Sequence, residues 1–413
     1  LALQPRTKLL PLMFAALLTA LLAAACAQQP PQAGQPSASQ ADEVSANEAA
    51  AFADVPIIDK FGKWPEKSGE PYYASKVGTW FTVWWTAQGA NTFDHWTQED
   101  WTRLKPVDYG YYSSGDAAYL TSVLQRMAYI GIDFITLDDT NGHWNDDGLI
   151  AENMASVFRV ADRLRPLSPQ VAICTGGPLR VQDIPEQRRE LDAYYRKFVT
   201  KYPESYFNWK GKPLVVMYLA RSADRRIEDP RFTIRYGTGL ITWQDGSQDT
   251  RIFETLGNWG WVFDLQNPGS EIMGAQPGYN KAHQGAPIKS VERKRGAHYI
   301  GQWLAAIKQD PECIILPSYN DHAEETGWEA TVPVRPAIPV AAQDVPGEDP
   351  YLYEKITEGY LALRYGFIDG FYYQVEGDDS VFVFNDSRLQ PTSAPDPLQE
   401  PVILLPEDYL AWY

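Results

Sequence analysis

The chain has 413 residues, with 36 lysines and arginines against 53 aspartates and glutamates, so its formal net charge is −17. This acidic balance repels phosphate backbones, which argues against nucleic acid as a partner and favours neutral ligands over acidic ones. Two of the three cysteines, Cys174 and Cys313, lie in apolar runs without a neighbouring histidine. We therefore expect buried free thiols rather than a disulfide, a nucleophile or metal ligands.

The first 25 residues have the pattern of a secretion signal. Arg6 and Lys8 precede an apolar core that is shorter than the roughly 20 residues of a membrane span, and three alanines lead to Cys26. Small residues followed by a cysteine resemble the lipobox of bacterial lipoproteins, where cleavage leaves that cysteine N-terminal and acylated. We predict a signal peptide at residues 1–25 and a protein exported and lipid-anchored at the cell envelope through Cys26. The alternative is a plain signal peptide with an incidental cysteine.

The rest of the chain divides into a tether and one large domain. Residues 26–52 are rich in Gln, Pro, Ala and Ser and cannot bury a core, which predicts a flexible tether. Residues 53–413 have a similar amino-acid composition throughout, without a long low-complexity break, which predicts a single domain. Its 14 tryptophans and 24 tyrosines favour carbohydrate binding, because the apolar faces of sugar rings stack on such side chains. Hydrophobic cores use aromatic residues too.

Short apolar runs alternate with amphipathic stretches along this domain, as expected of repeated βα units around a parallel sheet. The predicted strands are 77–85, 134–138, 171–174, 214–219, 239–243, 261–264, 314–318 and 370–374. The predicted helices are 116–130, 150–165, 185–202, 293–308 and 351–365. No glycine-rich phosphate loop follows the first strand, so we predict an α/β fold of the (β/α)8 TIM-barrel type with elaborated loops rather than a doubly wound sheet.

In a barrel of this type the active site lies on the loops that follow the strands. Aromatic and polar residues gather at these strand ends. The candidate substrate-binding residues there are Trp84, Trp85, Trp96, Asp138, Asp139, Tyr218 and Trp243.

The densest set of such residues follows the seventh predicted strand, at 318–329. Hydrolysis of a glycosidic bond needs one carboxylic acid to protonate the leaving oxygen and a second carboxylate as base or nucleophile. Asp321 and Glu324, three apart on a turn, can present both groups to one site. The expected substrate-binding neighbours of this pair are Asn320, His322, Glu325 and Trp328.

The run 318–329 resembles the Ser-(Trp/Tyr)-Asn-Glu-Trp-x-Glu-Gly-Thr-x-Ile-Glu stretch of glycoside hydrolase family 99, the group of endo-α-mannosidases. Other landmarks in matching order are Pro106, 110–116, 131–134, 211–214, 277–280, and Arg295-Gly296 before Tyr299 and Trp303. The resemblance implies a barrel fold and places the catalytic pair at Asp321 and Glu324. In the family the first residue assists attack by the 2-hydroxyl of the sugar, and the second is the acid/base.

The chain departs from the family at three places. Asp321 is one methylene shorter than the family's glutamate, and His322 replaces an aromatic residue. The residues 174–178 stand where the family has Glu-Pro-Tyr after the third strand. The resemblance therefore supports the fold and the site location more strongly than α-mannan as the substrate.

We predict that 53–413 is the catalytic domain of an exported glycoside hydrolase that is endo-acting on a neutral glycan without a metal or cofactor. Glu324 is the expected general acid, and Asp321 the base or nucleophile. A competing assignment pairs Glu324 with Asp138 or Asp139 across the mouth of the barrel. A different class of function is a non-catalytic glycan-binding surface lipoprotein. Glycosyl transfer is disfavoured, because nucleotide sugars are cytoplasmic and no phosphate cradle is evident.

Overall fold

The computed structural model describes residues 60–86, 96, 102–140, 148–176, 184–218, 226–242, 248–249, 257–262, 271–281, 290–334 and 348–413. The described residues all belong to one compact unit. The expected signal peptide, the tether with Cys26 and the candidate residue Trp243 lie outside the described residues. Among the helices of the described part, none combines the length and the apolar character needed to cross a membrane.

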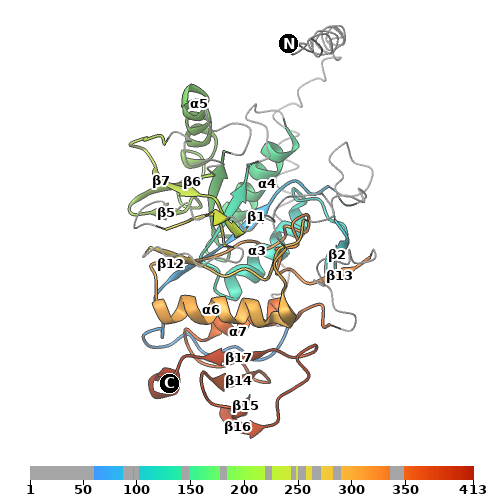
Figure 1. The fold of residues 1–413 in the computed structure, drawn as a ribbon. Helices are drawn as coiled ribbons and strands as arrows, with labels where there is room; N and C mark the ends of the chain where they lie inside the picture. The colour runs from blue at the N-terminus through green and yellow to red at the C-terminus, as the bar shows by residue number, and fades with distance from the viewer. Residues whose placement is uncertain are drawn as a thin grey trace, which may run out of the picture. The chain divides into compact units, whose positions relative to one another are not determined.

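The central element is an eight-stranded sheet in which seven strands run parallel (Figure 1). The pairing order is β11-β12-β1-β3-β4-β6, and β6 also pairs with β7 and, antiparallel, with β5. The strands are β1 (Lys76–Thr82), β3 (Phe134–Asp138), β4 (Gln170–Thr175), β5 (Asn208–Trp209), β6 (Lys212–Tyr218), β7 (Thr233–Gly237), β11 (Ile272–Gly274) and β12 (Cys313–Leu316). β3 and β12 are buried along their whole length, as expected of parallel strands covered on both faces.

The strands β8, β9 and β10, which follow β7, form a separate three-stranded sheet. β8 (Gly239–Thr242) begins one residue after β7 and pairs in parallel with β10 (Trp261–Val262) and antiparallel with β9 (Gln248–Asp249). β10 packs tightly against β11, because a Cβ atom added at Gly274 would lie 2.3 Å from Cγ2 of Val262. Ladder pairing within the described residues does not join β10 to β11. The described strands are therefore a curled, barrel-like sheet rather than a closed ring.

The predicted eighth barrel strand at 370–374 is wrong. β14 (Tyr372–Val375) belongs to a separate four-stranded sheet of order β16-β15-β14-β17, with β15 (Val381–Asn385), β16 (Arg388–Thr392) and β17 (Val402–Leu405). A short turn follows β14, so the next apolar run pairs with it as a hairpin instead of leading into a helix. β17 contacts α6 and α7, and Figure 1 shows the sheet beside these two helices.

The five predicted helices are present. They are α3 (Ala117–Tyr129), α4 (Leu149–Leu164), α5 (Ile184–Tyr194) with a following π-helical turn η1 (Tyr195–Val199), α6 (Ala297–Gln309) after the short η4 (Lys294–Gly296), and α7 (Leu352–Ala362). The C-terminal turn α8 (Tyr409–Trp412) was not predicted. α3 begins after Asp116, whose carboxylate accepts a hydrogen bond from the amide of Tyr119, the usual N-cap arrangement.

Two further features bear on the site. β2 (Leu104–Pro106) pairs antiparallel with β13 (Thr331–Pro333), which ties the segment before α3 to the end of the loop after β12. Cys174 and Cys313 are buried free thiols, as predicted, and burial raises the pKa of each thiol well above its ordinary value.

Candidate active site

Three carboxyl groups and one lysine come together at the carboxyl ends of the parallel strands. Asp138 ends β3, Lys281 follows β11, and Asp321 and Glu324 follow β12. Each carboxyl group lies close enough to influence its neighbours, since Glu324 and Lys281 both perturb the pKa values of Asp138 and Asp321. We call these four residues the acid–lysine cluster. Among the described residues, no set of three or more His, Cys, Asp and Glu side chains is arranged to hold a metal ion.

The loop after β12 is held in a tight turn that places Glu324 beside Asp321. The amide of Glu324 donates to Oδ1 of Asp321 at 2.9 Å, and the amide of Asp321 donates to Oγ of Ser318 at 2.8 Å. The amide of Thr326 closes the turn on the carbonyl of Asp321 at 3.1 Å. The short Asp321 side chain therefore caps its own turn, and this fixes the backbone positions from which the Asp321 and Glu324 side chains extend.

Asp321 is nearly inaccessible, with 2 % of its surface exposed. Burial raises the pKa of its carboxyl well above the ordinary value, and the nearby charge of Glu324 raises it further. The Glu324 amide and the Lys281 ammonium act in the opposite direction. This environment favours the protonated form of Asp321.

Glu324 has a different environment. Its side chain is 20 % exposed, and its Oε1 lies 2.7 Å from Nζ of Lys281. This ion pair stabilises the negative charge of Glu324, and the pKa of Lys281 is raised, chiefly by that charge. The cluster thus combines a buried carboxyl group with a raised pKa, Asp321, and a carboxylate that is paired with a lysine, Glu324. That distribution favours the opposite assignment of acid and base from the one predicted from the sequence.

Asp138 is the third carboxyl group, and it is 1 % exposed at the end of β3. Its Oδ1 accepts a hydrogen bond from the amide of Thr140 at 2.9 Å. Burial raises its pKa from 3.8 to about 6, against the effect of that hydrogen bond. The sequence-based pairing of Asp138 with Glu324 is therefore compatible with the structure, because both residues lie in one cluster.

We expect Asp138→Asn to stabilise the protein at neutral pH. The raised pKa means that ionising Asp138 costs folding free energy, and this cost appears as pH rises from about 4 to about 6. The variant cannot ionise at this position. Its free energy of unfolding should equal that of the wild type below pH 4 and exceed it by about 1 to 3 kcal/mol above pH 6. Urea unfolding across this pH range measures the difference, and a constant offset at every pH would contradict the assigned environment.

Asp139 points away from the cluster, which corrects its predicted role. It accepts a hydrogen bond from Tyr194 of α5, and Tyr194 also contacts Thr175 at 3.1 Å. Together with Glu190 and Tyr194, Asp139 lines a separate cavity of about 350 Å³ between α4 and α5. Adjacent residues at a strand end face opposite sides, so only one of the two aspartates can reach the cluster.

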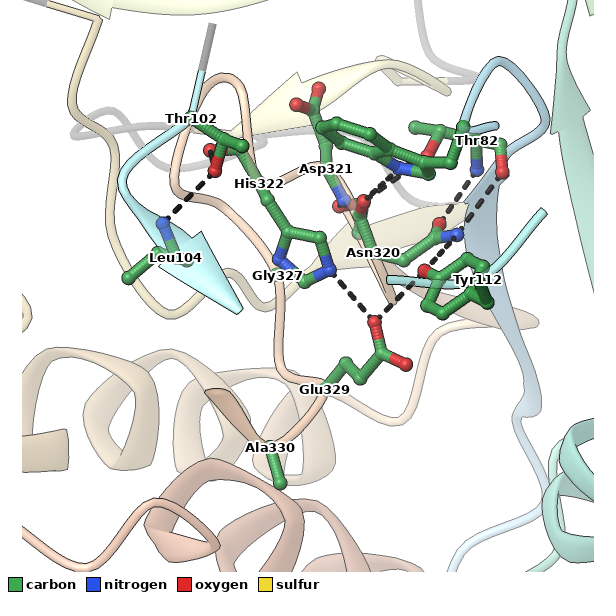
Figure 2. Close-up of polar contacts among 12 residues, drawn as sticks. Thr82, Thr102, Leu104, Tyr112, Asn320, Asp321, His322, Gly327, Glu329 and Ala330 are labelled. Carbon is green, nitrogen blue, oxygen red and sulfur yellow. Dashed lines mark hydrogen bonds and ion pairs between the residues drawn. The ribbon is translucent and has the colours of Figure 1, made fainter. Parts of the chain in front are cut away.

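Asn320 is fully buried and binds the protein backbone instead of facing a ligand. Its amide donates to the carbonyl of Thr82 and to the hydroxyl of Tyr112, each at 3.1 Å, and its oxygen accepts from the amide of Thr82 at 2.8 Å (Figure 2). The predicted substrate contact is therefore corrected. Asn320 anchors the loop after β12 to the end of β1.

His322 is also buried, at 1 % exposure, and pairs with Glu329 at 2.7 Å. Glu329 also accepts a hydrogen bond from the hydroxyl of Tyr112 at 3.0 Å. Figure 2 shows the His322 ring and the Asp321 carboxyl group pointing to opposite sides of the loop. His322 is thus a structural residue beneath the loop, which corrects its predicted substrate contact.

Glu325 forms a buried ion pair with Arg103, and its Oε2 accepts from Nδ2 of Asn280 at 3.1 Å. Its carbonyl accepts from Arg293 at 2.9 Å. These contacts turn its carboxylate into the protein, so the predicted substrate contact of Glu325 is corrected as well.

The tryptophans predicted to form sugar-stacking faces lie in the core. Trp84, Trp85, Trp96 and Trp328 are each at most 4 % exposed. The indole of Trp85 donates to Thr82, that of Trp96 to the carbonyl of Tyr112 and that of Trp328 to Thr79. The rings of all four tryptophans are packed within the protein, so the structure does not present them as sugar-stacking faces.

Of the predicted aromatic residues, Tyr218 is the one that the described structure leaves half-buried beside the cluster. It ends β6 and packs edge-on against Trp261 at 5.5 Å. It lies close enough to Lys281 and Tyr279 to interact electrostatically with both.

Lys281 and Tyr279 were missed by the sequence analysis. β11, which precedes them, has three residues and gave no periodic signal. The run 277–280 was noted only as a landmark, and the cation directly after it is the group that contacts Glu324. A lysine adjacent to a family landmark at a strand end was the available signal.

The chain matches no family model and no curated protein sequence. A solved structure of the GH99 endo-α-mannosidase from Bacteroides thetaiotaomicron matches with a TM-score of 0.50 and 13 % identity over 69 % of this chain and 96 % of that chain. The two proteins share a fold. The same enzyme with Bis-Tris propane matches with a TM-score of 0.49 at the same identity and coverage. A glycoside hydrolase-like protein matches with a TM-score of 0.43 and 11 % identity over 67 % of this chain and 91 % of that chain.

Proposed function

We propose that the protein is a glycoside hydrolase that cleaves internal bonds of a neutral oligosaccharide or polysaccharide with Asp321 and Glu324. The observation that carries this proposal is the contrast between these neighbours: one carboxyl group is buried, which raises its pKa, and the other is paired with Lys281. Two adjacent carboxyl groups in opposite protonation states are what glycosidic hydrolysis requires. The shared fold with an endo-α-mannosidase is consistent with this role.

The chemistry follows from the resting charges. Asp321 donates its proton to the oxygen of the leaving sugar as the bond between that oxygen and the anomeric carbon breaks. Water adds its oxygen to the anomeric carbon. In an inverting route Glu324 accepts the proton of this water directly, and proton exchange with solvent then restores both carboxyl groups. In a retaining route the Glu324 carboxylate first bonds to the anomeric carbon as the leaving sugar departs, and water then displaces Glu324 while the Asp321 carboxylate accepts the water's proton. Both routes consume one water.

The local charges favour a neutral sugar. In the described part of the chain, Lys281 is the cation that contacts the carboxyl groups of the cluster, and it is already paired with Glu324. An acidic sugar would compete with Glu324 for this ammonium group and would face two further carboxyl groups. The net charge of −17 acts in the same direction at longer range.

We also propose that the catalytic domain is a complete (β/α)8 barrel in which β8 and β10 close the gap between β7 and β11. The tight packing of Gly274 on Val262 supports this closure. A crystal structure in which β10 and β11 share backbone hydrogen bonds would support the closed barrel, and solvent between them would contradict it.

The N-terminal pattern supports a proposal about location, namely that the mature protein is exported and tethered to a membrane through acylated Cys26. Expression in a bacterial host with labelled palmitate should give a labelled, membrane-associated protein. Cys26→Ser should remove the label and release the protein. Equal labelling of both forms would contradict the anchor.

A panel of neutral glycans, including α-mannan, tests the proposed activity. New reducing ends and a ladder of oligosaccharides are expected from one polymer, because cleavage is internal. Release of monosaccharide alone would indicate attack at chain ends. Binding of a glycan by the protein without the release of any new reducing ends would favour a glycan-binding protein over an enzyme.

A further inference from the structure

Lys281 is anchored to Glu324 by more than its side chain. The amide of the preceding residue, Asn280, donates to the carbonyl of Glu324 at 2.9 Å. Tyr279 exchanges two backbone hydrogen bonds with Val291, at 3.0 and 2.8 Å, which fixes the segment that carries the lysine. The side chain of Lys281 therefore reaches Glu324 from a backbone position that these hydrogen bonds hold in place.

The groups that face Glu324 from the neighbouring elements are mostly acidic. Asp321 lies on the same loop, and Asp138 lies at the end of β3. Tyr279 and Tyr218 follow β11 and end β6, respectively. Against these groups Lys281 supplies the positive charge, at 2.7 Å from the Glu324 oxygen. Without it, a second negative charge beside Asp321 and Asp138 would be unfavourable, because neighbouring carboxylates cannot all ionise at low cost.

We propose that Lys281 is a positioning residue whose ammonium group, 2.7 Å from Oε1, holds Glu324 as the carboxylate beside the two buried carboxyl groups of Asp321 and Asp138. This inference rests on the proposed function only for the catalytic meaning of the two protonation states. Lys281 itself does not exchange a proton with the substrate. It keeps Glu324 available as the carboxylate, while burial raises the pKa of Asp321.

The burial pattern supports this division. Lys281 and Glu324 keep 30 % and 20 % of their side-chain surface exposed, so water assists in stabilising both charges. Asp321 is 2 % exposed and has no cation in contact in the described structure. The raised pKa of Lys281, caused first by Glu324, and the raised pKa of Asp321, caused first by burial, agree with this distribution.

Carboxyl-carbon NMR of the whole protein tests the position of the proton without any substrate. Glu324→Gln and Asp321→Asn identify the two signals by their loss. At pH 7 the wild type should show a charged Glu324 and a protonated Asp321. In Lys281→Met the Glu324 signal should move toward that of a protonated carboxyl group, because its cation is lost, whereas Asp321 should stay protonated, because Lys281 also opposes protonation there. Lys281→Arg, which keeps the charge, should restore the wild-type shifts, and Lys308→Met, at the exposed pair with Glu376, should leave them unchanged. An unchanged Glu324 signal in Lys281→Met would overturn the proposal.

The pH profile of kcat/KM gives the second readout once a cleaved glycan is known. Loss of a neighbouring opposite charge moves a titrating carboxylate by about 1 to 3 pH units. The acidic limb of the profile should move upward by that amount in Lys281→Met, and Lys281→Arg should return it. If the wild type hydrolyses the glycan but Lys281→Met leaves the Glu324 NMR signal and the pH profile unchanged, the proposed role of Lys281 is rejected and the enzyme assignment stands. A moved Glu324 signal in a protein that cleaves nothing would retain the charge assignment and reject the hydrolase.

Discussion

Glu324→Gln and Asp321→Asn each lower kcat/KM on the cleaved glycan by about 10²–10⁴-fold, the usual contribution of a general acid or base. Both changes keep the size of the side chain. In Asp321→Asn, Oδ1 can still accept the Glu324 amide that caps the turn at 2.9 Å. Initial rates of reducing-end release over a range of glycan concentrations measure the effect. The loss should lie in kcat rather than in KM, because the proton is needed in the transition state.

Glu376→Gln is the matched control for these variants. Glu376 pairs with Lys308 outside the acid–lysine cluster, and its side chain is 36 % exposed. Its removal should leave kcat/KM within twofold, about the scatter expected for a surface ion pair. A loss below tenfold in both Glu324→Gln and Asp321→Asn would remove this pair from the reaction.

The largest expected effect on stability comes from Arg103→Met. Arg103 and Glu325 form an ion pair with 3 % and 1 % side-chain exposure, so the change leaves a buried, uncompensated carboxylate. Loss of one partner of such a pair costs about 3 to 5 kcal/mol of unfolding free energy. Urea unfolding followed by tryptophan fluorescence measures it at neutral pH.

A double variant separates the ion pair from other contacts of Arg103. Arg103→Met with Glu325→Gln removes both charges and should recover part of the lost stability. Lys210→Met, at the exposed pair with Glu312, should cost less than about 1 kcal/mol. Equal costs for Arg103→Met and Lys210→Met would contradict a buried, charged Glu325.

The elements that sequence patterns predicted well are those with strong local signals. β3, β4, β6 and β12 are continuous apolar runs, and α3 and α4 have a clear apolar stripe and a marked beginning. β11 has three residues, and β7 carries Arg235 and Tyr236, so neither has a recognisable apolar period. β14 also pairs in parallel with β17, which lies well beyond the hairpin in the chain, and this non-local pairing gives no local sequence signal, which is why 370–374 was placed in the wrong sheet.

The structure brings some of the predicted site residues together and turns others into the protein. Asp138, Asp321 and Glu324 meet as part of one cluster, since the ends of parallel strands share one edge of the sheet. Whether a residue on such a loop faces the site or the core depends on turns and partners far away in sequence. His322 follows Asp321 directly, yet it turns to Glu329 beneath the loop.

Mass spectrometry of products formed in H₂¹⁸O tests the central claim most directly. Hydrolysis by the Asp321 and Glu324 pair predicts one ¹⁸O atom at each new reducing end with the wild type, and at least about a hundredfold less labelled product with Glu324→Gln. Undiminished labelled product from that variant would contradict the assigned site. A glycan that the wild type binds but leaves intact, without label, would contradict the hydrolase itself.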